Sequence, residues 1–223
     1  MSEHATASRA AEASERKHAL NLFFAIRSAP AVLAAAALLG AVTAWFGLVE
    51  TPMPSALAQE KVTLPLYRLL VLGVAVLPVV ALHSPLADLE VVATSRFRAR
   101  QRLFLASLSA GSAAIFLGTS ALVISAPVVE IMARSWLAWF GLALISGSLL
   151  GWRLSWILPS FVAVALWYWG TASSGQYQWW EFSARPSDDL PSHIISVVLL
   201  AAGLVMYAAT PWRRRLLRRG PHK

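Results

Sequence analysis

The chain has 223 residues, of which 57% are hydrophobic and only 13% are charged, and its mean hydropathy is +0.60. Ordinary soluble domains carry about a quarter charged residues, so this composition excludes a disordered chain and disfavours a soluble globular enzyme. The absence of cysteine also excludes a disulfide scaffold and a cysteine-ligated metal site. The formal net charge of +8 fits either nucleic acid or an anionic membrane surface, and the positions of the charges decide between these partners.

The first 29 residues form a polar segment that becomes amphipathic toward its end. Leu20 and Phe24 share a face at helical spacing, and Arg16 and Lys17 precede them. This pattern predicts a short interfacial helix on the cytoplasmic side, with Arg16 and Lys17 at the membrane surface. A cytoplasmic extension of the first membrane span is an equal alternative.

Six apolar stretches have the character of membrane-spanning helices, which need about 20 residues. They are residues 30–49, 64–82, 103–124, 136–150, 155–169 and 194–210. Arg68 lies near enough to the start of the second span to extend toward the interface, and Pro211 is expected to end the sixth. We predict an all-α, polytopic membrane protein with a transmembrane domain at residues 30–210 and a basic cytoplasmic tail at residues 211–223. A cleaved signal peptide is disfavoured, because a signal's apolar core has about 7–15 residues.

The basic residues concentrate on one side of these spans. Fifteen of the 19 Lys and Arg residues fall in the N-terminal segment, the second-to-third loop, the fourth-to-fifth turn and the C-terminal tail. The positive-inside rule therefore predicts that both termini are cytoplasmic. The tail arginines are Arg213, Arg214, Arg215, Arg218 and Arg219. We expect them on the anionic inner surface, so that anionic lipid, and not nucleic acid, is their partner.

The loop between the second and third spans has the most specific pattern. Pro85 stands at a position typical of the first turn of a helix, and Asp88 and Glu90 follow where acids complement the helix dipole. Four arginines then alternate into the third span, at positions 96, 98, 100 and 102. A short amphipathic helix of this kind suits a groove on a cytosolic partner protein. The simpler alternative is an arginine cluster that only sets the topology.

The run from Asp88 to Arg96, with the sequence DLEVVATSR, resembles the coupling helix of type-2 ATP-binding-cassette exporter permeases. The order of parts is also similar: an interfacial helix, six spans, and a longer outer segment before the last span. In that family a proline commonly follows the Ala-Thr pair, whereas Ser95 follows it here.

The resemblance implies a permease subunit that exports an amphipathic or hydrophobic substrate across the bacterial plasma membrane. Its partners would be a cytosolic ATPase subunit, which binds ATP and Mg, and a second copy or a related permease. The docking residues implied are Pro85, Asp88, Leu89, Glu90, Thr94, Ser95, Arg96 and Arg98.

The chain itself lacks the motifs of ATP hydrolysis and of metal catalysis. Neither G-x-x-x-x-G-K-[ST] nor H-E-x-x-H occurs, so we expect no enzyme activity, cofactor or metal in this chain. All acids fall outside the predicted spans, which disfavours a proton-coupled transporter. A non-transporting assembly or regulatory subunit is the main alternative. An intramembrane serine protease built on Ser146 and His193 is disfavoured, because Leu144 breaks the Gly-x-Ser-Gly motif and the two side chains are predicted to be out of reach.

Two prolines fall inside predicted spans, where a proline can kink a helix. They are Pro78 in the second span and Pro159 in the fifth. Both are candidate hinges of a transport cycle, and static bends are the alternative.

Overall fold

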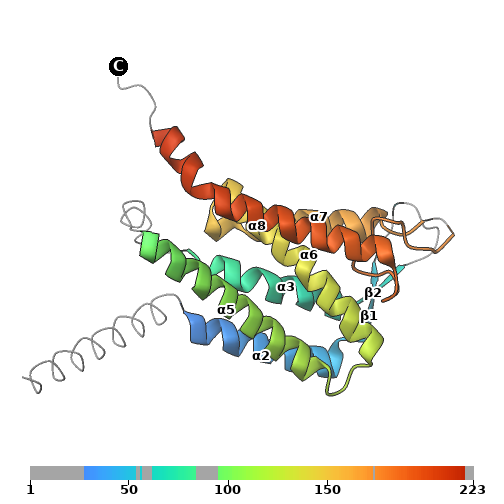
Figure 1. The fold of residues 1–223 in the computed structure, drawn as a ribbon. Coiled ribbons are helices and arrows are strands. Elements are labelled where there is room, and N and C mark those ends of the chain that lie inside the picture. The colour runs from blue at the N-terminus through green and yellow to red at the C-terminus, as the bar shows by residue number, and fades with distance from the viewer. Residues whose placement is uncertain (1–27, 54–55, 57–61, 84–94, 173, 219–223) are drawn as a thin grey trace, which may run out of the picture.

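Each of the six apolar stretches of the sequence contains a helix in the computed structural model (Figure 1). The structure describes residues 28–53, 56, 62–83, 95–172 and 174–218. The helices are α2 (Ala29–Phe46), α3 (Tyr67–Val80), α5 (Ser95–Ser120), α6 (Ala126–Leu150), α7 (Ile157–Trp169) and α8 (Leu190–Arg218). The other described elements are strands β1 (Glu50–Met53) and β2 (Val62–Pro65) and the 3-10 turn η1 (Trp152–Leu154).

Four of the described helices are long and apolar enough to cross a membrane. They are α2, α5 from Ala99, α6, and α8 as far as Ala209. The helices α3 and α7 have 14 and 13 residues, which is about 20 Å at the helical rise, against a hydrocarbon core of about 30 Å. The prediction of a mainly helical chain with multiple apolar helices is therefore confirmed, and the crossing of the membrane by α3 and α7 stays a prediction.

Three predicted helix boundaries are wrong. Helix α6 begins at Ala126 and not at residue 136, because Pro127 in its first turn has a backbone angle suited to a helix start. Helix α5 begins at Ser95, before the apolar run, so the alternating arginines lie in its first two turns. Helix α8 continues through Pro211 to Arg218, since a proline removes one hydrogen bond and need not end a helix.

The loop after α2 contains a hairpin that the sequence did not predict. Strands β1 and β2 pair antiparallel, with Glu50 opposite Pro65 and Met53 opposite Val62. Backbone N–H groups of Leu66 and Tyr67 donate to the carbonyl oxygens of Val49 and Gly47, just after α2, and continue this connection into α3. The hairpin thus joins the ends of α2 and α3 (Figure 1).

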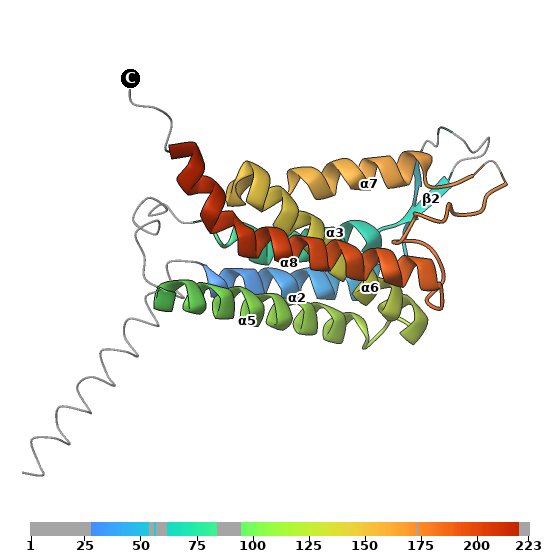
Figure 2. The same cartoon turned by 45° about the horizontal axis from the view of Figure 1, so that its top comes forward.

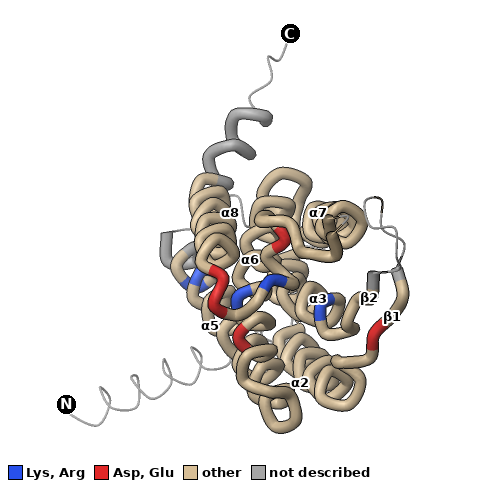
Figure 3. The backbone as a smooth tube through the Cα atoms, turned by 90° about the vertical axis from the view of Figure 1, so that its right-hand side faces the viewer, with Lys and Arg blue, Asp and Glu red and all other residues tan. Residues whose placement is uncertain are grey.

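The described acids lie at one end of the bundle, whereas described arginines lie at both ends. Every described acid lies at the end that carries β1 and β2, which we call the hairpin end (Figure 3). These acids are Glu50, Glu130, Glu181, Asp188 and Asp189. The opposite end, which we call the arginine end, carries Arg100 and Arg102 at the start of α5 and Arg153 in the turn between α6 and α7 (Figure 1).

The helices form two close pairs with α3 between them (Figures 1 and 2). Helix α5 packs along α2, and α6 packs along α8, whereas direct contact between α5 and α6 is much less extensive. Helix α3 contacts α2, α5 and α6. We call the boundary between α5 on one side and α6 and α8 on the other the seam.

The backbones of α6 and α8 touch at a pair of glycines. A Cβ atom on Gly141 would lie 2.5 Å from the carbonyl carbon of Leu199 and 2.7 Å from the nitrogen of Leu200. A Cβ atom on Gly203 would lie 2.8 Å from the Cα atom of Gly141. Small residues allow this approach between apolar helices, so Gly141 and Gly203 are packing partners at the crossing of α6 and α8.

We expect Gly141→Ala and Gly203→Ala each to destabilise the fold by about 1–3 kcal/mol, because the added methyl group overpacks a backbone contact. The matched control is Gly118→Ala in α5, where an added Cβ meets nothing within 4 Å. This control should be neutral or stabilising by up to about 1 kcal/mol. Thermal unfolding of the purified chain in detergent measures all three, and equal melting temperatures would contradict the close crossing.

Candidate functional site

A buried ion pair joins the start of α3 to the segment between α7 and α8. The Nη2 atom of Arg68 lies 2.8 Å from Oε1 of Glu181, with side-chain exposures of 3% and 1%. Arg68 also donates to the hydroxyl of Ser183, through Nη2 at 2.7 Å and Nε at 3.2 Å. Ser183 in turn donates to Glu181 at 2.7 Å. The expectation that Arg68 extends to the interface is therefore wrong, because a carboxylate lies over it inside the fold.

Arg134 holds the same segment from α6, through backbone carbonyls. It is only 3% exposed, and its guanidinium donates to the carbonyl oxygens of Pro186 at 2.8 Å, Arg185 at 2.7 Å and Phe182 at 3.1 Å. No carboxylate of the described residues lies within ion-pair distance of it. Arg134 lies outside the apolar stretch at residues 136–150, but it belongs to the same helix because α6 begins at Ala126.

The segment that these two arginines bind also packs against α6 and the end of α7. Trp139 of α6 is fully buried and contacts Phe182 edge to face, with ring centroids 4.9 Å apart. A Cβ atom on Gly170 would lie 2.5 Å from Oε2 of Glu181, so the small residue makes room for the carboxylate. Low-dielectric surroundings strengthen interactions between charges and make an unpaired charge costly. We call Arg68, Arg134, Glu181 and Ser183 the arginine clamp.

The clamp is continuous with the cap of α8. Asp189 accepts a hydrogen bond from the backbone N–H of Ser192 at 3.0 Å, which satisfies a free donor in the first turn of the helix. Arg185 forms an ion pair with Asp189 at 2.7 Å. Burial alone would raise the pKa of the Asp189 carboxyl, but the hydrogen bonds from Arg185 and Ser192 outweigh it and lower the pKa from 3.8 to about 2.

The polar contacts of the clamp close on one another. The carboxylate of Glu181 is paired with Arg68 and accepts a hydrogen bond from the hydroxyl of Ser183. Within the described ranges, no group of three His, Asp or Glu side chains is placed to hold a metal ion. The clamp fixes the segment over the hairpin ends of α3 and α6.

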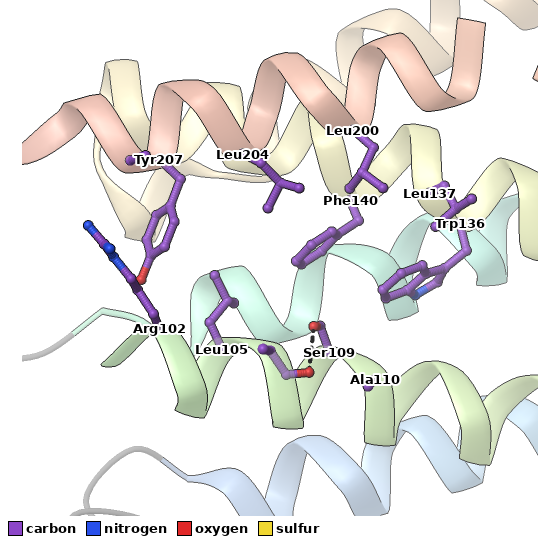
Figure 4. Close-up of a pocket in the computed structure, with 12 residues that line it drawn as sticks. Arg102, Leu105, Ser109, Ala110, Trp136, Leu137, Phe140, Leu200, Leu204 and Tyr207 are labelled. Atoms are coloured by element: carbon purple, nitrogen blue, oxygen red, sulfur yellow. Dashed lines mark hydrogen bonds between the residues drawn. The ribbon is translucent and has the colours of Figure 1, made fainter. Parts of the chain in front are cut away.

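A groove of about 470 Å³ lies on the seam, between α5, α6 and α8 (Figure 4). Its walls are almost entirely apolar. They include Leu105 from α5, Trp136 and Phe140 from α6, and Leu204 and Tyr207 from α8. The rings of Trp136 and Phe140 stack with centroids 5.0 Å apart and form one wall. Arg102 is the one charged residue of the lining.

The structure tests few of the predicted site residues. Residues 85–94 of the expected docking segment lie outside the described residues, as do Arg16, Lys17 and Arg219. Ser95, Arg96 and Arg98 lie in the first turn of α5. The remaining tail arginines, at positions 213, 214, 215 and 218, lie in the last turns of α8.

The two candidate hinges differ in position. Pro78 lies inside α3, three residues before the C-cap residue Ala81, and is buried. Pro159 is the third residue of α7, where a backbone N–H would have no partner within the helix. Pro159 therefore interrupts no helical hydrogen bond, and its position favours a helix start over a hinge.

The residues of the protease alternative are far apart. Ser146 donates to the carbonyl of Leu154 at 2.9 Å, near the arginine end. His193 lies in the first turn of α8, with Nδ1 3.0 Å from the carbonyl oxygen of Asp189. Helices α6 and α8 run parallel and meet at Gly141. Ser146 lies on the arginine-end side of this contact and His193 on the hairpin-end side, so roughly 20 Å separates them along the helix axes. A nucleophile and its base must lie within about 3 Å, so this pair does not form a catalytic site.

No family model, curated protein or solved structure matches the chain. The arginine clamp and the groove are the two candidate sites that the described residues form. The clamp was not predicted from the sequence, because its residues are distant along the chain. The available signal was Arg68, since an arginine within an apolar run needs a buried acid as its partner.

We expect Glu181→Gln to destabilise the protein by about 3–5 kcal/mol, because it leaves the buried Arg68 without its counter-charge. The double variant Arg68→Met, Glu181→Leu should recover most of this loss, since it removes both charges. Glu50→Gln, at an exposed acid of the same end, is the control and should change little. Unfolding in detergent provides the measurement, and a double variant no more stable than Glu181→Gln would argue against the ion pair.

Asp189→Asn should lower stability by about 1 kcal/mol at pH 7. The amide can still accept the hydrogen bond from Ser192, but the ion pair with Arg185 and the negative charge at the start of α8 are lost. The pKa of Asp189 is lower in the folded state, so its contribution is present above pH 3.8 and is lost as the pH falls toward 2. The difference between the variant and the parent should therefore shrink between pH 4 and pH 2. Asp188→Asn, at the exposed neighbour, is the control. A difference that stays constant over this range would contradict the assignment.

Proposed function

We propose that the chain is the membrane subunit of a type-2 ATP-binding-cassette exporter. The observation that carries the proposal is the run from Asp88 to Arg96, which joins α3 to α5 and leads into the arginine-rich first turns of α5. A separate cytosolic ATPase would bind ATP and Mg and dock on residues 85–98. The substrate would be amphipathic or hydrophobic, and a second copy or a related permease would complete the transporter.

The confinement of the described acids to the hairpin end supports the orientation that this function needs. The arginine end carries basic residues and none of the described acids, which is typical of the cytoplasmic side of a bacterial plasma membrane. The start of α2 and the end of α8 lie at that same end (Figure 1). In this orientation both termini are cytoplasmic, and the clamp lies on the outer side.

The helix packing suggests how a force on the docking segment, residues 85–98, would be transmitted to the other helices. The segment joins α3 and α5, so a force on it acts on both helices at their arginine ends. Helix α5 is coupled to α2, where Thr119 stands against Gly40, and α3 is coupled to α6. The approach of two ATPase subunits would therefore shift the α2–α5 pair relative to the α6–α8 pair. That shift would alternate the access of an apolar path between the two permease copies.

The test is purification of the tagged full chain from its native membrane, followed by identification of the bound proteins. We expect an ATP-binding-cassette ATPase in stoichiometric amount with the parent. The double variant Asp88→Arg, Glu90→Arg should lose it, because the basic groups of the ATPase that would pair with the two acids would repel two arginines. Asp188→Arg, an equivalent change at the hairpin end, should retain it.

A parent chain that is folded in the membrane but binds no such ATPase would overturn the proposal. Recovery of a different, non-ATPase membrane complex would favour an assembly or regulatory subunit instead. Retention of the ATPase by the double variant would remove residues 88 and 90 from the docking face.

A further inference from the structure

The groove on the seam is elongated along the helix axes. From Arg102 to Ala110 on α5, and from Leu200 to Ala208 on α8, its lining advances eight residues, or about 12 Å. Its volume is about 470 Å³, and all of its lining residues except Arg102 are uncharged. An elongated, uncharged groove of this kind fits an acyl chain that lies parallel to the helices.

The position of the groove determines what surrounds it. Helices α5, α6 and α8 are three of the four described helices that are long and apolar enough to cross a membrane. The lining alanines of α5 and α8 are exposed, so the groove opens on the outside of the bundle. In a bilayer such an opening faces hydrocarbon, and apolar walls offer no partners to water.

The positive charge at one end of the groove favours a ligand with a negatively charged headgroup. Arg102 is exposed and lies at the arginine-end mouth, beside the ring of Tyr207 (Figure 4). The described acids are all at the hairpin end, so no described carboxylate neutralises Arg102. A phosphate at the membrane surface supplies the missing negative charge and the hydrogen-bond acceptors that a guanidinium prefers.

We propose that the groove binds one acyl chain of an anionic phospholipid, with the lipid phosphate against Arg102. The chain lies along Phe140 and Leu204 and ends near Trp136, and it fills the space between α5 and the α6–α8 pair. This site depends on insertion in a membrane and not on the proposed transport function.

Native mass spectrometry of the full chain, released from nanodiscs of phosphatidylglycerol or of phosphatidylcholine, tests the site. The parent should retain one phosphatidylglycerol per chain more strongly than phosphatidylcholine. Ala110→Phe, which fills the groove, should abolish retention of both lipids. Arg102→Gln should weaken the retention of phosphatidylglycerol about fivefold and leave phosphatidylcholine unchanged.

Two matched variants serve as controls. Ala202→Phe enlarges an exposed alanine of α8 outside the groove, and Arg100→Gln removes an exposed arginine of α5 outside the groove. Both should retain phosphatidylglycerol as the parent does. The proposal is overturned if the parent retains no lipid, if Ala110→Phe retains as much as the parent, or if Arg100→Gln and Arg102→Gln weaken retention equally. A loss of oligomers in Ala110→Phe would also overturn it and assign the groove to a second copy.

Discussion

The buried ion pair between Arg68 and Glu181 is the constraint on which the hairpin end depends. Removing two charges from water costs several kcal/mol per ion, and here this cost is offset by a short contact and by the hydrogen bonds of Ser183. The pair ties the start of α3 to the segment that precedes α8. That segment in turn provides Asp189, which caps α8, so the position of the last helix follows from the same contact.

The two ends of the bundle are held together in different ways. At the hairpin end, Arg68 and Arg134 bind one polar segment from α3 and from α6, through directional hydrogen bonds. Toward the arginine end, α5 faces α6 and α8 across an apolar groove. Buried charge networks tolerate few alternative arrangements, because an unpaired buried charge is costly. The contacts at the clamp are therefore polar and directional, whereas those along the seam are apolar.

The sequence predicted the helices well and their ends poorly, for a physical reason. Hydropathy reports which residues favour hydrocarbon, whereas a helix continues wherever its backbone hydrogen bonds can form, through Arg96 at the start of α5 or through Pro211 in α8. The contact between Gly141 and Gly203 depends on how α6 and α8 pack against each other, which no local pattern predicts. The clamp could not be predicted either, because no local pattern links Arg68 to an acid in another loop.

The ion pair also sets an order of events during synthesis. Glu181 is translated 113 residues after Arg68, which at 5–20 residues per second is a delay of roughly 6–23 s. Throughout this interval α3 carries an arginine without its counter-charge, at a cost of up to about 3 kcal/mol if it enters the hydrocarbon. The ion pair can therefore form only after the segment following α7 has emerged. The contacts that bury Arg68 at the start of α3 are completed by residues from the C-terminal third of the chain.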